Sequence, residues 1–231
     1  ATLSIGSTTK TKFQERLDSY MEARHFNIAH TLKDVDETSL LKDLKKYERV
    51  IISIHQMTNK VGSNFGLTTK ELTLIQNINR QNEVILVIFG SPYSLKYFEN
   101  IDHILMAYED TPETEDITAQ GLTGVFGFKG KLPVTASNIF PCNHGFTTPS
   151  LKRMGYSVPE RVGMCSDSLT YISTIANYMI EIGAAPGCQV LIAKDGRIIY
   201  EQAFGSHTYK DDNPVYLTDL YDIASVTKVA A

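Results

Sequence analysis

Ser225 and Lys228 are the residues of this chain best suited to covalent chemistry, and they stand three positions apart. In a helix this spacing places the hydroxyl and the amine one turn apart on the same face. An ammonium group there lowers the cost of ionising the serine, and a neutral amine can accept its proton. The spacing often arises by chance. Here it follows a predicted helix, a predicted hairpin and the pair Phe204-Gly205, and that order makes the pattern much more specific.

A second set of candidates lies in four loops that should follow the strands of a parallel sheet, where such sheets bind ligands. The loops are Gly6-Ser7-Thr8-Thr9, His55-Gln56, Gly90-Ser91-Pro92-Tyr93 and Tyr108-Glu109-Asp110. The first loop could hold a phosphate through its N–H groups and hydroxyls. It lacks both the Gly-x-Gly-x-x-Gly and the Gly-Lys-Ser/Thr patterns, so helix capping is the favoured interpretation.

Five carboxylates surround the expected start of a helix: Glu109, Asp110, Glu113, Glu115 and Asp116. Thr111-Pro112 reads as an N-cap followed by the first helical residue, and Ser91-Pro92 reads the same way. Paired carboxylates can act as general acid and base. Acids at a helix start more often serve capping and solvation, because they interact favourably with the helix dipole, and that is the favoured interpretation.

The three cysteines predict neither a disulfide framework nor a zinc site, because they are an odd set without a Cys-x-x-Cys pair. Cys142 and His144 could share a metal ion, but a buried thiol and a surface imidazole are favoured. We therefore expect no metal site and no cofactor.

Residues 1–135 alternate short apolar runs with segments of helical period. The strands are expected at 2–5, 25–29, 49–54, 83–89 and 103–107, and the helices near 10–20, 37–47, 69–80, 92–98 and 112–124. Strands of nearly pure Val, Ile and Leu, each followed by a helix, indicate a parallel sheet buried on both faces. The prediction is an α/β fold with a doubly wound, mainly parallel, five-stranded sheet in a flavodoxin-like sandwich.

The composition of the 231 residues is that of a globular protein, with 42% hydrophobic and 21% charged residues. A formal net charge of −4 gives no basic surface for nucleic acid. The longest apolar runs, at 50–54 and 84–89, have the length of strands, and none could span a membrane.

Residues 136–162 are rich in Pro and Gly and are predicted to be a linker. A second domain, 163–231, should begin with a helix whose apolar face holds Leu169, Ile172, Ala176, Met179 and Ile180. Gly183 should end that helix, and Asp195-Gly196 should turn a hairpin. The chain opens in an apolar run and closes in a helix-like pattern, Val229-Ala230-Ala231, so we expect an excised fragment with a truncated α+β segment.

Residues 163–231 resemble the start of serine β-lactamase-like hydrolases of the penicillin-binding and class C type. The matching stretches are Ala185-Pro186-Gly187-Cys188-Gln189-Val190, Asp195-Gly196-Arg197 with Phe204-Gly205, and Ser225-Val226-Thr227-Lys228. The resemblance implies that Ser225 is the acylated nucleophile and Lys228 its general base. The family's later motifs, a Tyr-x-Asn or Ser-x-Asn and a Lys-Thr-Gly-like strand, are not found in this sequence.

Residues 1–135 resemble the α/β sandwich that follows the catalytic barrel in glycoside hydrolase family 3. The stretches are Phe13-Gln14-Glu15-Arg16-Leu17, Phe89-Gly90-Ser91-Pro92-Tyr93, Ala107-Tyr108-Glu109 and 128–134. Chains that join a β-N-acetylglucosaminidase barrel, this sandwich and a β-lactamase-like module fit both halves in order. In that family the glycosidase residues lie in the barrel, so none is assigned to this chain.

These resemblances imply a fragment of a modular hydrolase of the cell envelope, periplasmic or on the cell surface, whose parent cleaves β-linked N-acetylglucosamine or related glycosides. The fragment itself is expected to be structural and catalytically inactive, and to meet carbohydrate only through the missing barrel. One alternative is a flavodoxin-like module that binds a small molecule or phosphate. Another is a serine hydrolase whose site a second chain completes. The apolar faces of 166–183 and 188–204 are expected to dock on the sandwich or to form a homodimer.

Overall fold

The computed structural model describes residues 1–30, 35–210 and 213–229, so Ala230 and Ala231 of the predicted helix-like ending lie outside the described residues. The chain forms two compact units, Ala1–Lys152 and Arg153–Ala231. The division falls inside the segment that the sequence predicts as a linker, and before residue 163.

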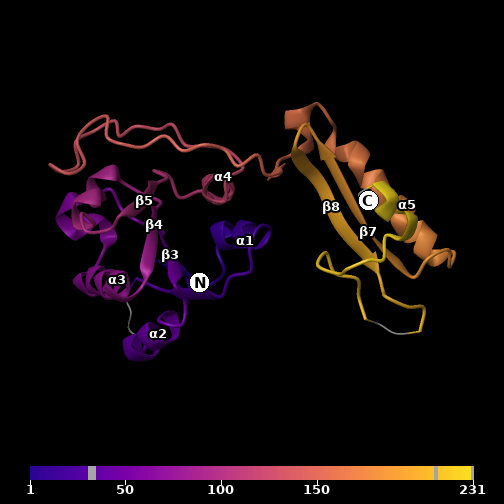
Figure 1. Cartoon of the computed structure of the whole chain (residues 1–231), viewed down its shortest axis with the longest axis horizontal. Helices are drawn as coiled ribbons and strands as arrows, with labels where there is room; N and C mark the ends of the chain where they lie inside the picture. The colour runs from indigo at the N-terminus through magenta and orange to yellow at the C-terminus, as the bar shows by residue number, and fades with distance from the viewer. Residues whose placement is uncertain (31–34, 211–212, 230–231) are drawn as a thin grey trace. The chain divides into compact units, whose positions relative to one another are not determined.

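The first unit is built on a five-stranded, all-parallel sheet, which confirms the predicted α/β class (Figure 1). Its strands run in the order β2-β1-β3-β4-β5. They are β1 Thr2–Ile5, β2 His25–Ile28, β3 Arg49–Ile54, β4 Glu83–Ile88 and β5 His103–Met106. The order reverses between β1 and β3, and at such a switch point the carboxyl ends of parallel strands open a crevice for ligands.

Four α-helices cover the two faces of this sheet, α1 and α4 on one side and α2 and α3 on the other (Figure 1). Their bounds are α1 Lys12–Asp18, α2 Glu37–Leu44, α3 Thr69–Gln81 and α4 Pro112–Leu122. Thr11, Thr68 and Thr111 each cap a helix by accepting a backbone N–H.

The helix predicted at 92–98 forms only a 3₁₀ helix, Pro92–Tyr97, and a second 3₁₀ segment spans Val61–Gly66. Ser91 and Pro92 hold the predicted N-cap and first helical positions, but the side chain of Ser91 makes no capping bond. Instead the hydroxyl of Ser94 donates to the carbonyl of Ser91 at 2.8 Å. The N–H of Ser94 donates to the same carbonyl at 3.1 Å, and this backbone bond between residues three apart is the one that defines a 3₁₀ turn.

The core follows the two-residue period of the strands. Residues 50, 52 and 54 of β3 pack toward α2 and α3, in one cluster with Leu44 and Leu74. Ile51 faces the other way and packs with Phe13, Phe89 and Ala119, under α1 and α4. The strands are therefore buried on both faces, as their apolar sequences predict.

Residues 123–152 are irregular and return along the first unit. The N–H of Leu151 donates to Gly124 at 2.7 Å, and that of Thr148 donates to Phe128 at 2.9 Å. These bonds explain why the unit continues to Lys152. Cys142 is exposed in this segment, so the predicted buried thiol is wrong, while His144 is partly exposed.

The second unit joins one long helix to a small mixed sheet of order β6-β8-β7 (Figure 1). Its elements are β6 Gly155–Tyr156, a 3₁₀ helix Pro159–Val162, α5 Ser166–Glu181, β7 Gly187–Lys194, β8 Arg197–Gly205 and a 3₁₀ helix Ala224–Val229. Asp195 and Gly196 have φ of 52° and 72°, so the predicted hairpin turn forms. Gly183 follows α5 with φ of 72°, as expected of a helix stop.

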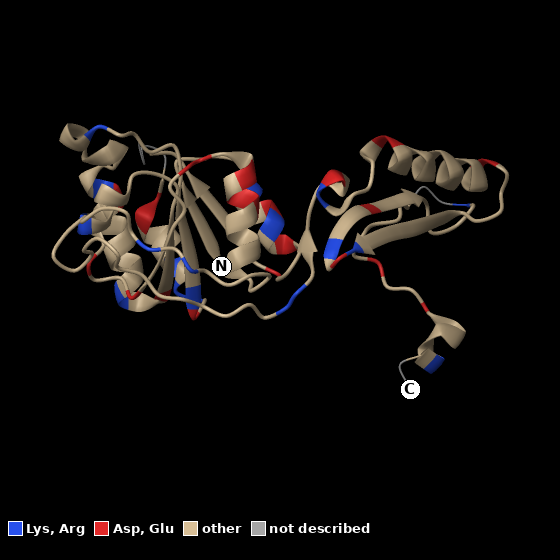
Figure 2. Cartoon of the chain, turned by 90° about the horizontal axis from the view of Figure 1, so that it is seen from above, with Lys and Arg blue, Asp and Glu red and all other residues tan. Residues whose placement is uncertain are grey.

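Two residues of the apolar face predicted for α5, Leu169 and Ala176, are buried. A second apolar stripe on the same helix is exposed and comprises Tyr171, Ile175, Tyr178 and Ile182. Figure 2 shows this helix uncharged between its acidic ends. None of the helices formed by the described residues is both long and apolar enough to cross a lipid bilayer.

Candidate functional site at the carboxyl edge of the sheet

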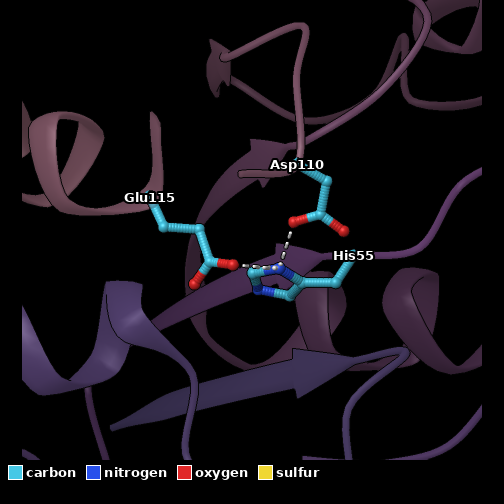
Figure 3. Close-up of side chains that lie close together, drawn as sticks. All are labelled: His55, Asp110 and Glu115. Atoms are coloured by element: carbon cyan, nitrogen blue, oxygen red, sulfur yellow. Dashed lines mark hydrogen bonds and ion pairs between the residues drawn. The ribbon is translucent and has the colours of Figure 1, made fainter. Parts of the chain in front are cut away.

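Three titratable side chains converge where the parallel strands end: His55, Asp110 and Glu115 (Figure 3). We call them the carboxyl-edge cluster. His55 follows β3 directly and continues the alternation of Ile51 and Ser53. The alternation points its ring to the face covered by α1 and α4. Asp110 precedes the cap residue of α4, and Glu115 lies in the first turn of that helix.

The imidazole of His55 is fixed on every side that the structure describes. Only 2% of the residue is exposed. Its ring stacks on Phe89, with centroids 4.8 Å apart and planes inclined by 19°. Nε2 lies 3.0 Å from the hydroxyl of Ser53, which lies 2.8 Å from the hydroxyl of Ser4. Because Nε2 is held in this way, Nδ1 faces the two carboxylates.

In each carboxylate, one oxygen points at His55 and the other accepts a hydrogen bond from a backbone N–H. Asp110 Oδ1 lies 3.0 Å from Nδ1, and Glu115 Oε1 lies 3.7 Å from the same atom. Asp110 Oδ2 accepts the N–H of Gln56 at 2.5 Å, and Glu115 Oε2 accepts the N–H of Phe13 at 2.9 Å. Gln56 adopts a positive φ of 50°, which belongs to the turn after β3.

The two carboxyl groups differ in their affinity for a proton. Burial acts to raise the pKa of Asp110, but the hydrogen bonds from His55 and Gln56 outweigh it and hold that pKa below its ordinary value. Burial raises the pKa of Glu115, and the charge of Asp110 acts in the same direction. When the pair holds one proton, that proton therefore resides mainly on Glu115.

A second buried pair lies behind the cluster. Glu71 is fully buried and accepts from His30 Nδ1 at 2.7 Å, while His30 Nε2 donates to the carbonyl of His55 at 2.9 Å. The hydrogen bond to Glu71 raises the pKa of His30. Gly6 has φ of 98°, and an added Cβ would lie 2.6 Å from the carbonyl oxygen of His55. A glycine is thus required where β1 ends beside His55.

The hydroxyl of Ser7 bonds within the loop Gly6-Ser7-Thr8-Thr9 and caps no helix, so the interpretation of this loop as a helix cap is wrong. Ser7 Oγ donates to the carbonyl of Thr9 at 2.8 Å and accepts the N–H of Thr9 at 3.3 Å. The helix that follows has seven residues and is capped by Thr11. The loop therefore gives no support to a phosphate site.

Capping and solvation are the wrong interpretation for three of the five acids. Asp110 and Glu115 face His55, and Asp116 pairs with Arg16 at 2.6 Å. Glu109 and Glu113 are exposed, as the sequence predicts. The acids at 110 and 115 turn inward because α4 lies over the face that carries Ser53 and His55.

The structure brings Ser225 and Lys228 together in the 3₁₀ helix Ala224–Val229, where Lys228 Nζ donates to Ser225 Oγ at 2.9 Å. Both residues are exposed. A hollow of about 320 Å³ in the same unit is lined by Pro186, Gly187, Ser206, His207, Val215, Asp219, Leu220 and Tyr221. Ser225 and Lys228 are not part of this lining, and their catalytic role stays a prediction.

The sequence placed His55 and Asp110 in loops expected to meet at one edge, but it did not group them with Glu115. A signal was available in β3, where Ser53 and His55 interrupt one face of an otherwise apolar strand. Two polar residues two positions apart on a buried face require partners. Acids at the start of the helix on that face are the natural choice.

Comparisons with known proteins place the chain in no family. No family model matches it, and no curated protein matches it. One similar solved structure is a glycoside hydrolase family 3 β-N-acetylglucosaminidase from Paenibacillus sp. str. FPU-7, with a TM-score of 0.43 and 14% identity, over 53% of this chain and 25% of that chain.

Another is a fungal multi-domain family 3 β-N-acetylglucosaminidase whose description names a GCN5-related glucosamine N-acetyltransferase region. It has the same TM-score of 0.43 and 14% identity, over 91% of this chain and 27% of that chain. This chain thus spans about a quarter of the length of these structures. A likeness at this level carries no argument about what the chain binds or catalyses.

Proposed function

We propose that this chain is the α/β sandwich of a modular glycoside hydrolase of family 3, of the β-N-acetylglucosaminidase type, followed by the start of a serine β-lactamase-like module. The observation that carries the proposal is the order of the two units. An all-parallel sandwich is followed by a long helix, a hairpin with an Asp-Gly turn and a contacting Ser-x-x-Lys pair. That order matches the two sequence resemblances, including the stretches 89–93 and 107–109 that follow β4 and β5.

We propose that the first unit supports carbohydrate cleavage without performing it. Glycosidases use two carboxyl groups about 5–5.5 Å apart when they retain configuration and about 6.5–9.5 Å apart when they invert it. Asp110 and Glu115 each accept a backbone N–H with one carboxylate oxygen and direct the other oxygen at His55. A pair engaged in this way cannot flank a sugar ring, so the unit serves as a structural or rim domain.

We further propose that Ser225 and Lys228 do not catalyse acyl transfer in this chain. Acyl transfer requires hydrogen-bond donors for the oxyanion, fixed in a site from which water is excluded. Both residues are exposed, so water surrounds the hydroxyl and screens the ammonium.

A location in the periplasm or at the cell surface is part of the same proposal, and cell fractionation with an antibody to the chain tests it.

The test of inactivity uses the whole chain with a chromogenic β-N-acetylglucosaminide and, separately, with a fluorophosphonate probe. We expect no hydrolysis and no labelled Ser225. Hydrolysis that disappears in Asp110→Asn would contradict the first half of the proposal. Labelling that disappears in Ser225→Ala would contradict the second half and favour a functional serine hydrolase completed by another chain.

The test of the modular assignment is the gene sequence immediately before the codon of Ala1. We expect it to encode a catalytic barrel that contains a carboxylate nucleophile and a His-containing acid element. An open reading frame that begins at this chain, or a neighbouring domain of another class, would overturn the assignment to a glycosidase. This outcome is independent of whether the chain itself binds a ligand.

A further inference from the structure

We propose that the carboxyl-edge cluster binds a divalent transition-metal ion of the Zn²⁺ type through His55 Nδ1, Asp110 Oδ1 and Glu115 Oε1. These three atoms lie within 4.8 Å of one another. The separations from Nδ1 are 3.0 Å to Asp110 and 3.7 Å to Glu115. Tetrahedral zinc with bonds of about 2.0–2.1 Å needs ligand atoms about 3.3 Å apart. The two separations from Nδ1 bracket that value, and the two carboxylate oxygens, which lie within 4.8 Å of each other, must come to about the same distance when the ion binds.

Each proposed ligand is already held by an interaction on its far side. His55 Nε2 contacts Ser53 Oγ, Asp110 Oδ2 accepts from Gln56, and Glu115 Oε2 accepts from Phe13. Metal-binding imidazoles and carboxylates are usually oriented by such outer hydrogen bonds. Figure 3 shows the result, with both carboxylates directed at one nitrogen of the ring.

The donor set favours a divalent transition-metal ion such as Zn²⁺ over Mg²⁺, Ca²⁺ and Cu(I). One imidazole nitrogen and two carboxylate oxygens suit Zn²⁺, whereas Mg²⁺ and Ca²⁺ prefer oxygen donors alone and Cu(I) prefers sulfur. About 22% of the Asp110 side chain and 12% of the Glu115 side chain are exposed, while His55 is buried. Solvent therefore reaches the cluster on its carboxylate side, where an ion can enter and a water molecule can fill the fourth position.

The hydrogen bonds around His55 permit the proton movement that metal binding requires. In the neutral tautomer that carries its proton on Nδ1, Nδ1–H donates to Asp110 and Nε2 accepts from Ser53. Metal binding at Nδ1 requires the other neutral tautomer: Nδ1 releases its proton to solvent, Nε2 takes up one proton from solvent, and Nε2–H then donates to Ser53 Oγ. Ser53 can turn its own hydrogen toward Ser4, 2.8 Å away. In both arrangements His55 Nε2, Ser53 Oγ and Ser4 Oγ each keep a hydrogen-bond partner.

A bound ion would join the end of β3 to the start of α4, and thus tie a sheet strand to the helix that covers it. This role is independent of the proposed glycosidase assignment. A ligand that binds only the folded chain stabilises it, because unfolding must release the ion.

The experiment is calorimetric titration of Zn²⁺ into the whole chain after dialysis against a chelator. The test variants are Asp110→Asn and Glu115→Gln, which keep the shape of the side chain. The matched control is Glu113→Gln, which removes the same charge from the same helical turn at an exposed position. Thermal unfolding of each variant without metal establishes that it is folded.

We expect one equivalent to bind, with affinity reduced at least about tenfold in each test variant and unchanged in the control. Because a variant can misfold, the absorption of bound Co²⁺ in the unchanged chain gives a second reading. We expect a four-coordinate spectrum without a thiolate band. No saturable binding, equal binding by all variants, or a thiolate band from Cys142, Cys165 or Cys188 would each overturn the proposal.

Discussion

His55 is the residue at which the interactions of the carboxyl edge meet. Its ring is stacked on Phe89, its Nε2 contacts Ser53, and its Nδ1 faces Asp110 and Glu115. Its carbonyl also accepts a bond from His30. A buried polar group costs free energy unless it is paired, so the position of this ring depends on all these partners.

Ser53→Ala is predicted to lower the free energy of unfolding by about 1–3 kcal/mol, since it leaves His55 Nε2 and Ser4 Oγ without their shared partner. Urea unfolding measures the change. Ser63→Ala, at an exposed position, should alter stability by less than about 0.5 kcal/mol. Equal changes in the free energy of unfolding for the two substitutions would show that the hydrogen bonds of Ser53 do not stabilise the fold.

Asp219 carries a pH-dependent contribution to the second unit. The hydrogen bond from His207 at 2.6 Å, with that from the N–H of Tyr216, lowers its pKa below the ordinary 3.8. A lowered pKa stabilises the folded chain above the ordinary value, and the gain is lost as the pH falls through the lowered pKa. Asp219→Asn should therefore destabilise the unit near neutral pH and make no difference in strong acid. Unfolding curves from about pH 7 down to about pH 2 test this, and a constant difference would contradict it.

The sequence predicted which loops lie at the carboxyl edge of the sheet. It did not predict which side chains of those loops contact one another. His55 and Asp110 were both placed at strand ends, yet they are 55 residues apart and join only through the packing of α4 on the sheet. Glu115 was interpreted as a capping acid, because a local sequence pattern does not show which residues of the sheet the helix packs against. Ser225 and Lys228, in contrast, are three residues apart, and their contact followed from local spacing alone.

Among the elements, those with a strong local period were predicted closely. The predicted bounds of β1 and β3 match the structure, and α3 differs by one residue at its end. The segment 123–152 has no period, so its bonds back to Gly124 and Phe128 could not be foreseen. The same long-range bonds place the division of the units at Lys152.

The hairpin of β7 and β8 depends on its two turn residues, both with positive φ. Gly196→Ala is expected to cost about 1–2 kcal/mol, since a side chain disfavours that backbone conformation. Nothing lies within 4 Å of the added Cβ, so the cost is conformational and not steric. Asp195→Asn serves as a control, because Asn tolerates the left-handed region and should leave stability unchanged. Hydrogen exchange across β7 and β8 gives the measurement, and unchanged exchange in Gly196→Ala would contradict it.

At the scale of the whole molecule, apolar burial is unequal between the two units. Among the described residues, the buried apolar side chains of the second unit are Pro159, Leu169, Ala176, Ile199 and Val215, and all the others lie in the first. The exposed stripe of α5 adds apolar surface of the kind that proteins usually cover.

We predict that this surface is covered either by the first unit or by a second copy of the chain. Light scattering across a range of concentrations, with hydrogen exchange at 187–205, distinguishes the two. A dimer that Ile175→Lys dissociates would support self-association, and a protected monomer would support docking on the first unit. A monomer with fast exchange across the hairpin would contradict both.

His55, Asp110 and Glu115 converge at the edge of the sheet, where we propose that they bind one metal ion. The most direct measurement is the nitrogen-15 NMR spectrum of the histidine rings in the whole chain, before and after one equivalent of Zn²⁺. We predict that the Nδ1 resonance of His55 shifts to that of a metal-bound nitrogen and that Nε2 becomes the protonated nitrogen of the ring. Resonances of His55 that stay unchanged while another histidine responds would contradict the claim.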